Sequence, residues 1–213
     1  MAQIIPTILV KNFSEFKDAV KKIEDDFEIA QIDVMDGKFV KNTTYYNLEE
    51  ILEMETKLQF ELHLMVKNPI PYIHESEISN SIRRILFHYE AVENHEEVIH
   101  LIHSVGKEAG IVLNPETRTD KIKDLIKDVE VVMLMGVNPG FSGQKFLEET
   151  IERVSKIHEM ASDIAISVDG GIDDTNAGQL IQAGAVMLSV NSFLYKGDPF
   201  KQQKILLGND DGN

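Results

Sequence analysis

Short hydrophobic runs alternate with longer amphipathic segments along the chain. The short runs are typical of buried parallel strands, and they occur at residues 3–9, 29–35, 59–65, 84–89, 108–113, 129–135, 164–168 and 185–190. Helical periodicity predicts helices at residues 14–23, 94–105, 117–126, 147–160 and 175–183. A strand-then-helix unit repeated about eight times favours a closed barrel over an open doubly wound sheet, which usually has fewer strands. We therefore expect one α/β domain, a (β/α)8 TIM barrel at residues 1–206, followed by a flexible tail at 207–213.

Polar residues interrupt several of the predicted strands. Side chains alternate between the two faces of a strand, and in AQIDVMDG this alternation puts Gln31 and Asp33 on the face toward the barrel interior. It also puts Thr7, His63 and Asp169 inward, near the C-terminal strand ends where barrel active sites lie. Each residue alone is compatible with an ordinary structural role. Together, two buried carboxylates beside a histidine are costly unless they bind a cation or share protons, which predicts catalytic or metal-binding chemistry.

Turn-forming segments follow the last three predicted strands, with the sequences VNPGFSGQKF, DGGI and VNSF. Phosphate sites in barrels are often built from these loops and from a helix N-terminus next to them. Gly140, Gly143, Gly170 and Gly171 would let backbone N–H groups approach an anion closely. One such loop would be a weak signal, but three consecutive strand exits predict a phosphate site.

Other polar residues are expected to have lesser roles. Asp36, just before a glycine, is expected to shape the exit from the second strand. His88 and Glu90 at the end of the fourth strand are expected to border the site. The histidines of HEEVIH have the wrong spacing for a two-histidine zinc motif, and a solvated helix face is the preferred interpretation.

Composition narrows the class of protein. The 213 residues are 43% hydrophobic and 27% charged, which is globular composition. The chain has 21 Lys and Arg residues against 36 Asp and Glu residues, so its formal net charge is −15. Such a surface repels polyanions, and we expect no nucleic-acid partner and no membrane partner. A local site can still bind a small anion. The absence of cysteine excludes a disulfide framework and indicates a cytoplasmic setting, and no stretch has the pattern of a secretory leader or a membrane span.

Taken together, the motifs resemble those of the ribulose-phosphate 3-epimerase family. The similarity covers nearly the whole chain, in family order and spacing, through IIPTILV, IDVMDGKFV, ELHLMVKNPIPYI, FHYEA, AGIVLNPET, LMGVNPGFSGQKF, SVDGGI and SVNSF. Related phosphate-binding barrels, orotidine-phosphate decarboxylase and hexulose-phosphate synthase, carry a catalytic lysine between aspartates. Met35 stands where that lysine would be sought, which argues against them.

The resemblance implies a metal-assisted isomerase. Asp33 and Asp169 would be the catalytic acid and base, working through an enediolate to interconvert ribulose 5-phosphate and xylulose 5-phosphate in carbohydrate metabolism. One divalent ion (Zn, Mn, Fe, Co or Mg) would be held by Asp33, His63 and Asp169. The family's fourth ligand, a histidine, falls at Gln31. Substrate-binding positions would be Thr7, His63, Gly140, Phe141, Ser142, Gly143, Gly170, Gly171, Asn191 and Ser192.

Departures from the family pattern leave alternatives open. Gln31 would weaken the metal site and shift its preference toward harder ions. Asn191 replaces a family glycine, and because asparagine tolerates a left-handed backbone, the backbone amides at this position can remain available. A close relative, allulose-6-phosphate 3-epimerase, shares most of the motifs, so another ketose phosphate is an alternative substrate. A phosphate-ligand-binding barrel that has lost turnover is the alternative from a different class. The oligomeric state is left undecided by the sequence, and a homo-oligomer is one alternative, since family barrels are often dimers or larger.

Overall fold

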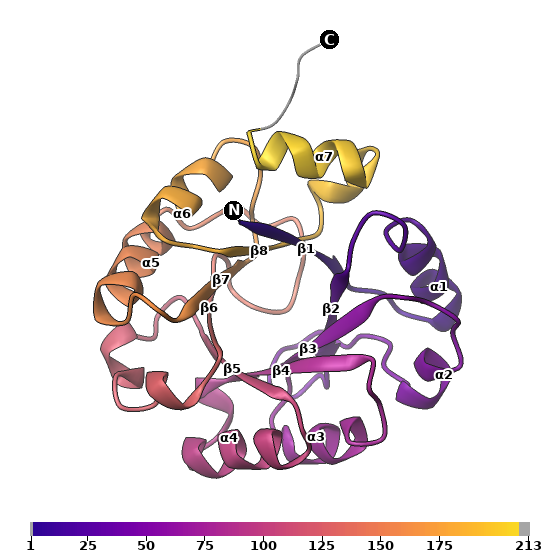
Figure 1. Cartoon of the computed structure of the whole chain (residues 1–213), viewed down its shortest axis with the longest axis horizontal. Helices are drawn as coiled ribbons and strands as arrows, with labels where there is room; N and C mark the ends of the chain where they lie inside the picture. Colours follow the sequence, from indigo (N-terminus) through magenta and orange to yellow (C-terminus); the bar gives the residue numbers. More distant parts are fainter. Residues whose placement is uncertain (1, 209–213) are drawn as a thin grey trace.

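The computed structural model describes residues 2–208. Eight parallel strands form a closed barrel in chain order, and the ring closes where β1 pairs with β8. The strands are β1 (Gln3–Ile8), β2 (Ile29–Met35), β3 (Gln59–Met65), β4 (Ile82–His88), β5 (Glu108–Leu113), β6 (Val131–Met135), β7 (Ala165–Asp169) and β8 (Met187–Val190). Figure 1 shows the strands as a central ring with the helices arranged around its outside. The predicted (β/α)8 barrel is confirmed.

Seven α-helices cover the barrel in the described part of the chain. They are α1 (Phe13–Lys21), α2 (Leu48–Leu52), α3 (Ile70–Ser76), α4 (His95–Ser104), α5 (Glu149–Met160), α6 (Ala177–Ala183) and α7 (Pro199–Leu206). None of them has the length and apolar character needed to cross a membrane. The sequence pattern does not reveal α2 and α3, because five and seven residues are too few for a helical period to stand out.

The helix predicted at residues 117–126 is wrong. The segment forms two 3₁₀ turns, η2 (Thr119–Ile122) and η3 (Ile126–Asp128). Thr119 and Ile122 are both buried, as are Ile126 and Val129, so the buried positions come in pairs three residues apart. A spacing of three matches the 3₁₀ helix, in which side chains at i and i+3 lie on the same side.

The alternation of side chains in the strands creates two separate interiors. Outward residues such as Ile32 and Val34 join the large apolar layer between strands and helices. Inward residues form a smaller core inside the barrel, made of Ile5, Ile29, Leu86, Val112, Val131, Met133, Met135 and Met187. This core separates two buried polar clusters, one at each end of the barrel, and Asp33, His63 and Asp169 belong to the C-terminal one.

The C-terminal end of the described chain is helical. Helix α7 begins after Asp198, whose side chain accepts a hydrogen bond from the Lys201 N–H at 3.0 Å, and it ends at Leu206, which is buried. Residues 209–213 of the predicted tail lie outside the described residues, so its flexibility stays a prediction.

Candidate active site

Strand register brings residues from distant parts of the chain to one end of the barrel. Asp33 on β2 is level with His63 on β3, and Met135 on β6 is level with Asp169 on β7. All four lie in the C-terminal halves of their strands with their side chains inside the barrel. Parallel pairing aligns strand ends, so four short motifs converge there without any direct sequence link between them.

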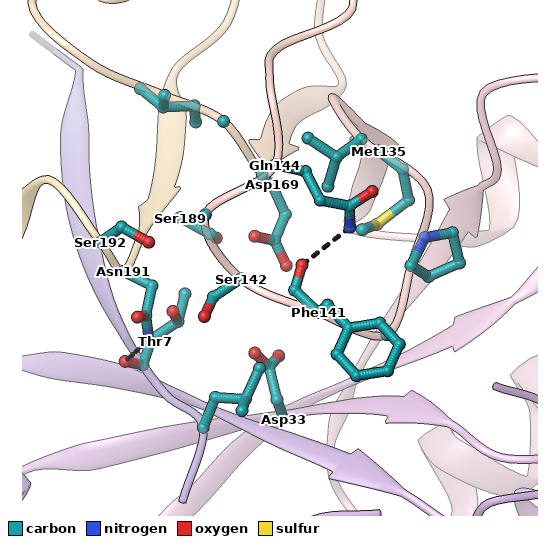
Figure 2. A pocket seen from close by; sticks show the side chains of 18 of the residues that line it. Thr7, Asp33, Met135, Phe141, Ser142, Gln144, Asp169, Ser189, Asn191 and Ser192 are labelled. Atoms are coloured by element: carbon teal, nitrogen blue, oxygen red, sulfur yellow. Dashed lines mark hydrogen bonds between the residues drawn. The ribbon is translucent and has the colours of Figure 1, made fainter. Parts of the chain in front are cut away.

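Asp33, His63 and Asp169 form a buried cluster. One ligand atom from each residue lies within 4.8 Å of the others. His63 Nδ1 is 3.1 Å from Asp33 Oδ1 and 3.1 Å from Asp169 Oδ2. Figure 2 shows the two carboxylates reaching toward each other from opposite sides of the cavity. The sequence-predicted trio therefore meets, and its carboxylates sit where a small molecule could lie above them.

The electrostatic balance of the cluster is set by burial and by the two carboxylates. Burial opposes the charge on His63, but hydrogen bonds to Asp169 and Asp33 outweigh it and raise the imidazole pKa to about 10. Burial also raises the pKa of Asp33, while the hydrogen bond to His63 partly offsets it. A carboxyl group whose pKa is shifted toward neutrality is suited to hold and release a proton during catalysis.

A row of polar side chains continues from the far side of His63. His63 Nε2 is 2.9 Å from His88 Nε2, and His88 Nδ1 is 3.5 Å from Glu90 Oε2. Glu90 in turn accepts hydrogen bonds from the Asn114 N–H at 3.0 Å and from the Thr117 hydroxyl. Burial lowers the pKa of His88 to about 4, so this imidazole is neutral and can accept from His63 through Nε2. The arrangement orients His63 with Nδ1 toward the two aspartates.

Gln31 also points into the cluster. Its Nε2 donates to Asp33 Oδ1 at 2.8 Å and to Asp169 Oδ2 at 2.7 Å, and it lies 3.2 Å from His63 Nδ1. Its Oε1 is buried and has no hydrogen-bond partner among the described residues. Gln31 therefore lies beside Asp33, His63 and Asp169, as the sequence predicts. Its amide nitrogen is the atom that faces them.

The donor set of the cluster fits a divalent metal ion at three positions. Carboxylate oxygens and an imidazole nitrogen serve Zn, Fe, Co and Mn, and carboxylates also serve Mg. The fourth neighbour, Gln31, could contribute only its oxygen, because an amide nitrogen has no free lone pair. The residues present are thus able to hold a metal ion.

A cavity of about 240 Å³ opens above the cluster, a size that suits a small molecule and not a macromolecule. Among the residues that line it are the predicted site residues Thr7, Asp33, Gly140, Phe141, Ser142, Gly143, Asp169, Gly170, Gly171, Asn191 and Ser192. His63 does not line the cavity and is fully buried behind the two aspartates. Met35, Met65 and Met135 form an apolar part of the wall.

The loop after β6 is tied down at both ends of its glycine-rich stretch. Gln144 Nε2 donates to the Asn138 and Phe141 carbonyls at 2.7 and 2.8 Å, the second of which is drawn in Figure 2. Asn42 Nδ2, on the loop after β2, donates to the Gly140 carbonyl at 2.8 Å. Phe141 is 57% exposed at the loop tip. The loop is therefore positioned over the cavity by side-chain amides that the sequence analysis missed.

The loops after β7 and β8 form the part of the cavity wall next to the β6 loop. Gly170 and Gly171 have φ of 102° and 71°, a left-handed backbone that favours glycine. A Cβ on Gly171 would come within 2.8 Å of the Phe146 backbone, so no side chain fits there. Asn191 does not use the left-handed backbone that asparagine tolerates, because no non-glycine residue in 2–208 has a positive φ. Asn191 instead donates from Nδ2 to the Thr7 carbonyl at 2.9 Å and so links β8 to β1.

Lys196 was not expected at the site. It lies on the 3₁₀ turn η4 (Leu194–Lys196) after β8, is exposed, and is the only lysine or arginine among the described residues that line the cavity. Its Nζ is 5.5 Å from the centre of the Phe193 ring. The sequence signal that points to this location is the position of Lys196 four residues after the predicted anion-binding Ser192.

Two other sequence-based expectations are settled by geometry. Asp36 accepts hydrogen bonds from the backbone N–H groups of Lys38, Phe39 and Lys67, at 2.8, 3.0 and 2.9 Å, and so shapes the exits of β2 and β3. His103 on α4 lies 3.1 Å from Glu130 near the protein surface, and it does not line the cavity. Both residues have the structural roles expected of them.

Comparison with known proteins agrees with the geometry. The family model described as "Ribulose-phosphate 3 epimerase family" matches residues 3–195. A ribulose-phosphate 3-epimerase from Chlamydia muridarum is 35% identical, with 96% of this chain and 93% of that protein covered. One from Bacillus subtilis is 36% identical, with 92% and 93% covered.

Solved structures share the fold at lower identity. The tryptophan synthase α-subunit from Pyrococcus furiosus has a TM-score of 0.71 and 14% identity, covering 97% of this chain and 98% of that one. A 3-hexulose-6-phosphate synthase has a TM-score of 0.68 and 14% identity, covering 97% and 99%. The two structures show the barrel architecture alone, whereas the family match and the relatives decide membership: this chain belongs to the ribulose-phosphate 3-epimerase family.

Proposed function

We propose that the protein is a sugar-phosphate 3-epimerase that interconverts ribulose 5-phosphate and xylulose 5-phosphate. The observation that carries this proposal is the pair of carboxylates, Asp33 from β2 and Asp169 from β7, facing each other at the floor of a small cavity. Epimerisation at a carbon beside a carbonyl needs a base on one face and an acid on the other. A facing carboxylate pair supplies both groups.

The roles of the two aspartates follow from their placement. One carboxylate removes the proton from carbon 3, and the other returns a proton to the opposite face of the planar enediolate, which inverts the centre. In the reverse reaction they exchange roles. Met35, Met65 and Met135 present apolar surface to the planar intermediate and keep water away from it.

A divalent metal ion forms part of this proposal, with Asp33, His63 and Asp169 as its ligands. When bound, the ion would stabilise the negative charge that develops on the substrate oxygens. His63 would bind through Nδ1, the nitrogen that faces the aspartates, and its Nε2–H would donate to His88. Zn, Mn, Fe, Co and Mg are the candidate ions.

The loops after β6, β7 and β8 would bind the phosphate. The proposed contacts come from Gly140 to Gly143, Gly170, Gly171, Asn191 and Ser192, all on the cavity wall. Lys196 adds a positive charge to the same cavity. The protein has a net charge of −15 and repels anions as a whole, so a local cation would offset that repulsion for a dianionic sugar phosphate. Thr7 would contact the sugar from β1.

A phosphate-binding barrel without turnover is a second candidate, favoured by one observation. The Gln31 nitrogen occupies the space between the carboxylates, where the family pattern implies a histidine ligand. The retained carboxylate pair favours the enzyme. The hexose substrate allulose 6-phosphate also stays open, because its epimerase shares most of the sequence motifs of this chain.

Incubation in deuterated water separates these candidates. The protein is mixed with ribulose 5-phosphate and with each candidate metal ion in turn, and deuterium at carbon 3 and xylulose 5-phosphate are measured. Allulose 6-phosphate is assayed in parallel. Deuterium incorporation with product formation is expected. No incorporation with any ion and either sugar rejects the epimerase.

A further inference from the structure

The Gln31 side chain lies at the point where the candidate metal ligands converge. Its nitrogen is within hydrogen-bond distance of a carboxylate oxygen from Asp33 and from Asp169, at 2.8 and 2.7 Å. The same atom is 3.2 Å from His63 Nδ1, and the whole side chain is buried. The atoms that would surround an ion therefore surround an amide nitrogen instead.

The nitrogen and the oxygen of the Gln31 amide differ in their hydrogen bonding. Nε2 has two N–H groups, and both find carboxylate acceptors. Oε1, the only atom of the amide able to bind a metal, is buried without a hydrogen-bond partner among residues 2–208. The observed orientation thus suits the protein without a metal ion, and a half-turn of the amide would be needed to present oxygen to an ion.

We propose that Gln31 takes the place of the cation in the metal-free protein and must turn over before a divalent ion binds. This inference rests on the metal site of the proposed function and concerns how that site gains and loses its ion. The half-turn gives up the two hydrogen bonds that Nε2 donates to the carboxylates. Residue 31 therefore makes the ion weakly held and exchangeable, and keeps the empty site ordered.

The proposal also orders the ions by preference. After the half-turn the site would offer oxygen from Asp33, Asp169 and Gln31 and one nitrogen from His63. Oxygen-rich sets favour harder ions such as Mn²⁺ and Mg²⁺, whereas a second imidazole would favour Zn²⁺. We expect the ratio of Zn²⁺ affinity to Mn²⁺ affinity to be lower in the natural chain than in Gln31→His.

The first test compares Gln31→His with the matched control Gln59→His, which places the same residue at the exposed start of β3. Each full-length protein is stripped with a chelator and titrated calorimetrically with Mn²⁺ and then with Zn²⁺. We expect Gln31→His to bind both ions about 10–100-fold more tightly than the natural protein, with the larger gain for Zn²⁺. The control should match the natural protein. Equal or weaker binding by Gln31→His overturns the proposal.

The second test uses Gln31→Glu, which keeps the shape of the side chain but replaces its donor with an acceptor. The metal-free variant should melt below the metal-free natural protein, because Asp33 and Asp169 lose their donor and gain a like charge. Added Mn²⁺ should restore its Tm, and a variant that folds only with Mn²⁺ supports the same conclusion. A metal-free Gln31→Glu as stable as the natural protein overturns it.

A third measurement needs no variant with a changed site. In ¹⁵N-labelled natural protein, addition of Zn²⁺ should shift the Gln31 side-chain NH₂ resonance, since the amide loses both carboxylate acceptors. An unchanged resonance at saturating Zn²⁺ contradicts the turn. None of these measurements depends on turnover. Failure of the deuterium assay alone would reject the epimerase and leave the role of Gln31 standing.

Discussion

The barrel contains two buried charged clusters, and they differ in how their charges are balanced. At the N-terminal end, Arg84 lies between Glu61 and Glu108, with Nη1 2.8 Å from Glu61 and Nη2 2.7 Å from Glu108. At the C-terminal end, Asp33 and Asp169 share a single imidazole and an uncharged amide. The first cluster has a permanent cation with a fork of donors, whereas the second has only a titratable one.

This difference in charge balance matches the structural role of the N-terminal end and the proposed catalytic role of the C-terminal end. A guanidinium cannot be deprotonated and forms directional bonds to both carboxylates, so the N-terminal cluster is held in one state. The C-terminal carboxylates border a cavity and face an imidazolium that can lose its proton and then bind a metal ion beside them. Each end of the barrel therefore contains a pair of carboxylates, and the partner of the pair makes the N-terminal cluster fixed and the C-terminal cluster adaptable.

The largest expected effect is on turnover at the C-terminal cluster. Asp169→Asn should lower kcat by about 10²–10⁴-fold, because the amide can neither take nor deliver the proton. Circular dichroism and Tm should show that the fold is retained. Asp173→Asn, on the same cavity wall, is the control and should keep most of the activity. Comparable losses in both variants would argue against the assigned roles.

The second prediction concerns the opposite end of the barrel. Arg84→Met leaves Glu61 buried without its cation and should destabilise the protein by about 3–5 kcal/mol. Activity per folded molecule should change little, since the cluster lies away from the cavity. Urea denaturation measures the first quantity and kcat the second. A catalytic loss with unchanged stability would erase the contrast between the two clusters.

The third prediction is the pH dependence of stability without metal. The raised pKa of His63, about 10 against 6.5, means that its contribution is complete below pH 6.5 and is lost as the pH rises toward 10. In chelator, the Tm should fall over that range. The decline should be smaller in His63→Gln, while His103→Gln, a change at an exposed histidine, should leave the decline unaltered. An unaltered decline in His63→Gln would place the titration elsewhere.

The fourth prediction tests the groups behind His63. Glu90→Gln should weaken the hold on His88 and, through it, the orientation of His63, lowering metal affinity about 10–100-fold. Calorimetric titration with Mn²⁺ is the readout, with Glu93→Gln as a control on the following loop. Unchanged affinity would mean that His63 is oriented by Asp33 and Asp169 alone.

The smallest expected effect is at the cavity rim. Lys196→Gln should raise KM for the sugar phosphate about 10-fold with kcat nearly constant, because an exposed charge contributes modestly to binding. The KM of the natural protein should also rise with salt more steeply than that of the variant. Lys201→Gln on α7 is the control. A fall in kcat without a rise in KM would show that Lys196 does not act on the phosphate.

The strands and most of the cavity wall could be predicted because strand alternation is a local property of the chain. Once the alternation in IDVMDG and in SVDGG is known, parallel pairing leaves no choice about which end Asp33 and Asp169 reach. The prediction at residues 117–126 was wrong because i+3 and i+4 patterns overlap in a short segment. Lys196 and Gln144 were missed because their approach to the cavity depends on loop paths.

The sequence alone therefore determined the barrel, its inward and outward faces, and the meeting of Asp33, His63 and Asp169, since each follows from a two-residue period and one pairing rule. Only the tertiary structure decided which atom of Gln31 faces the carboxylates, how His63 is held by His88, and that a lysine stands at the rim. Those features depend on contacts between separate strands and loops. The physical reason is that hydrogen-bond partners are chosen by distances of a few tenths of an ångström, which packing sets and no local pattern encodes.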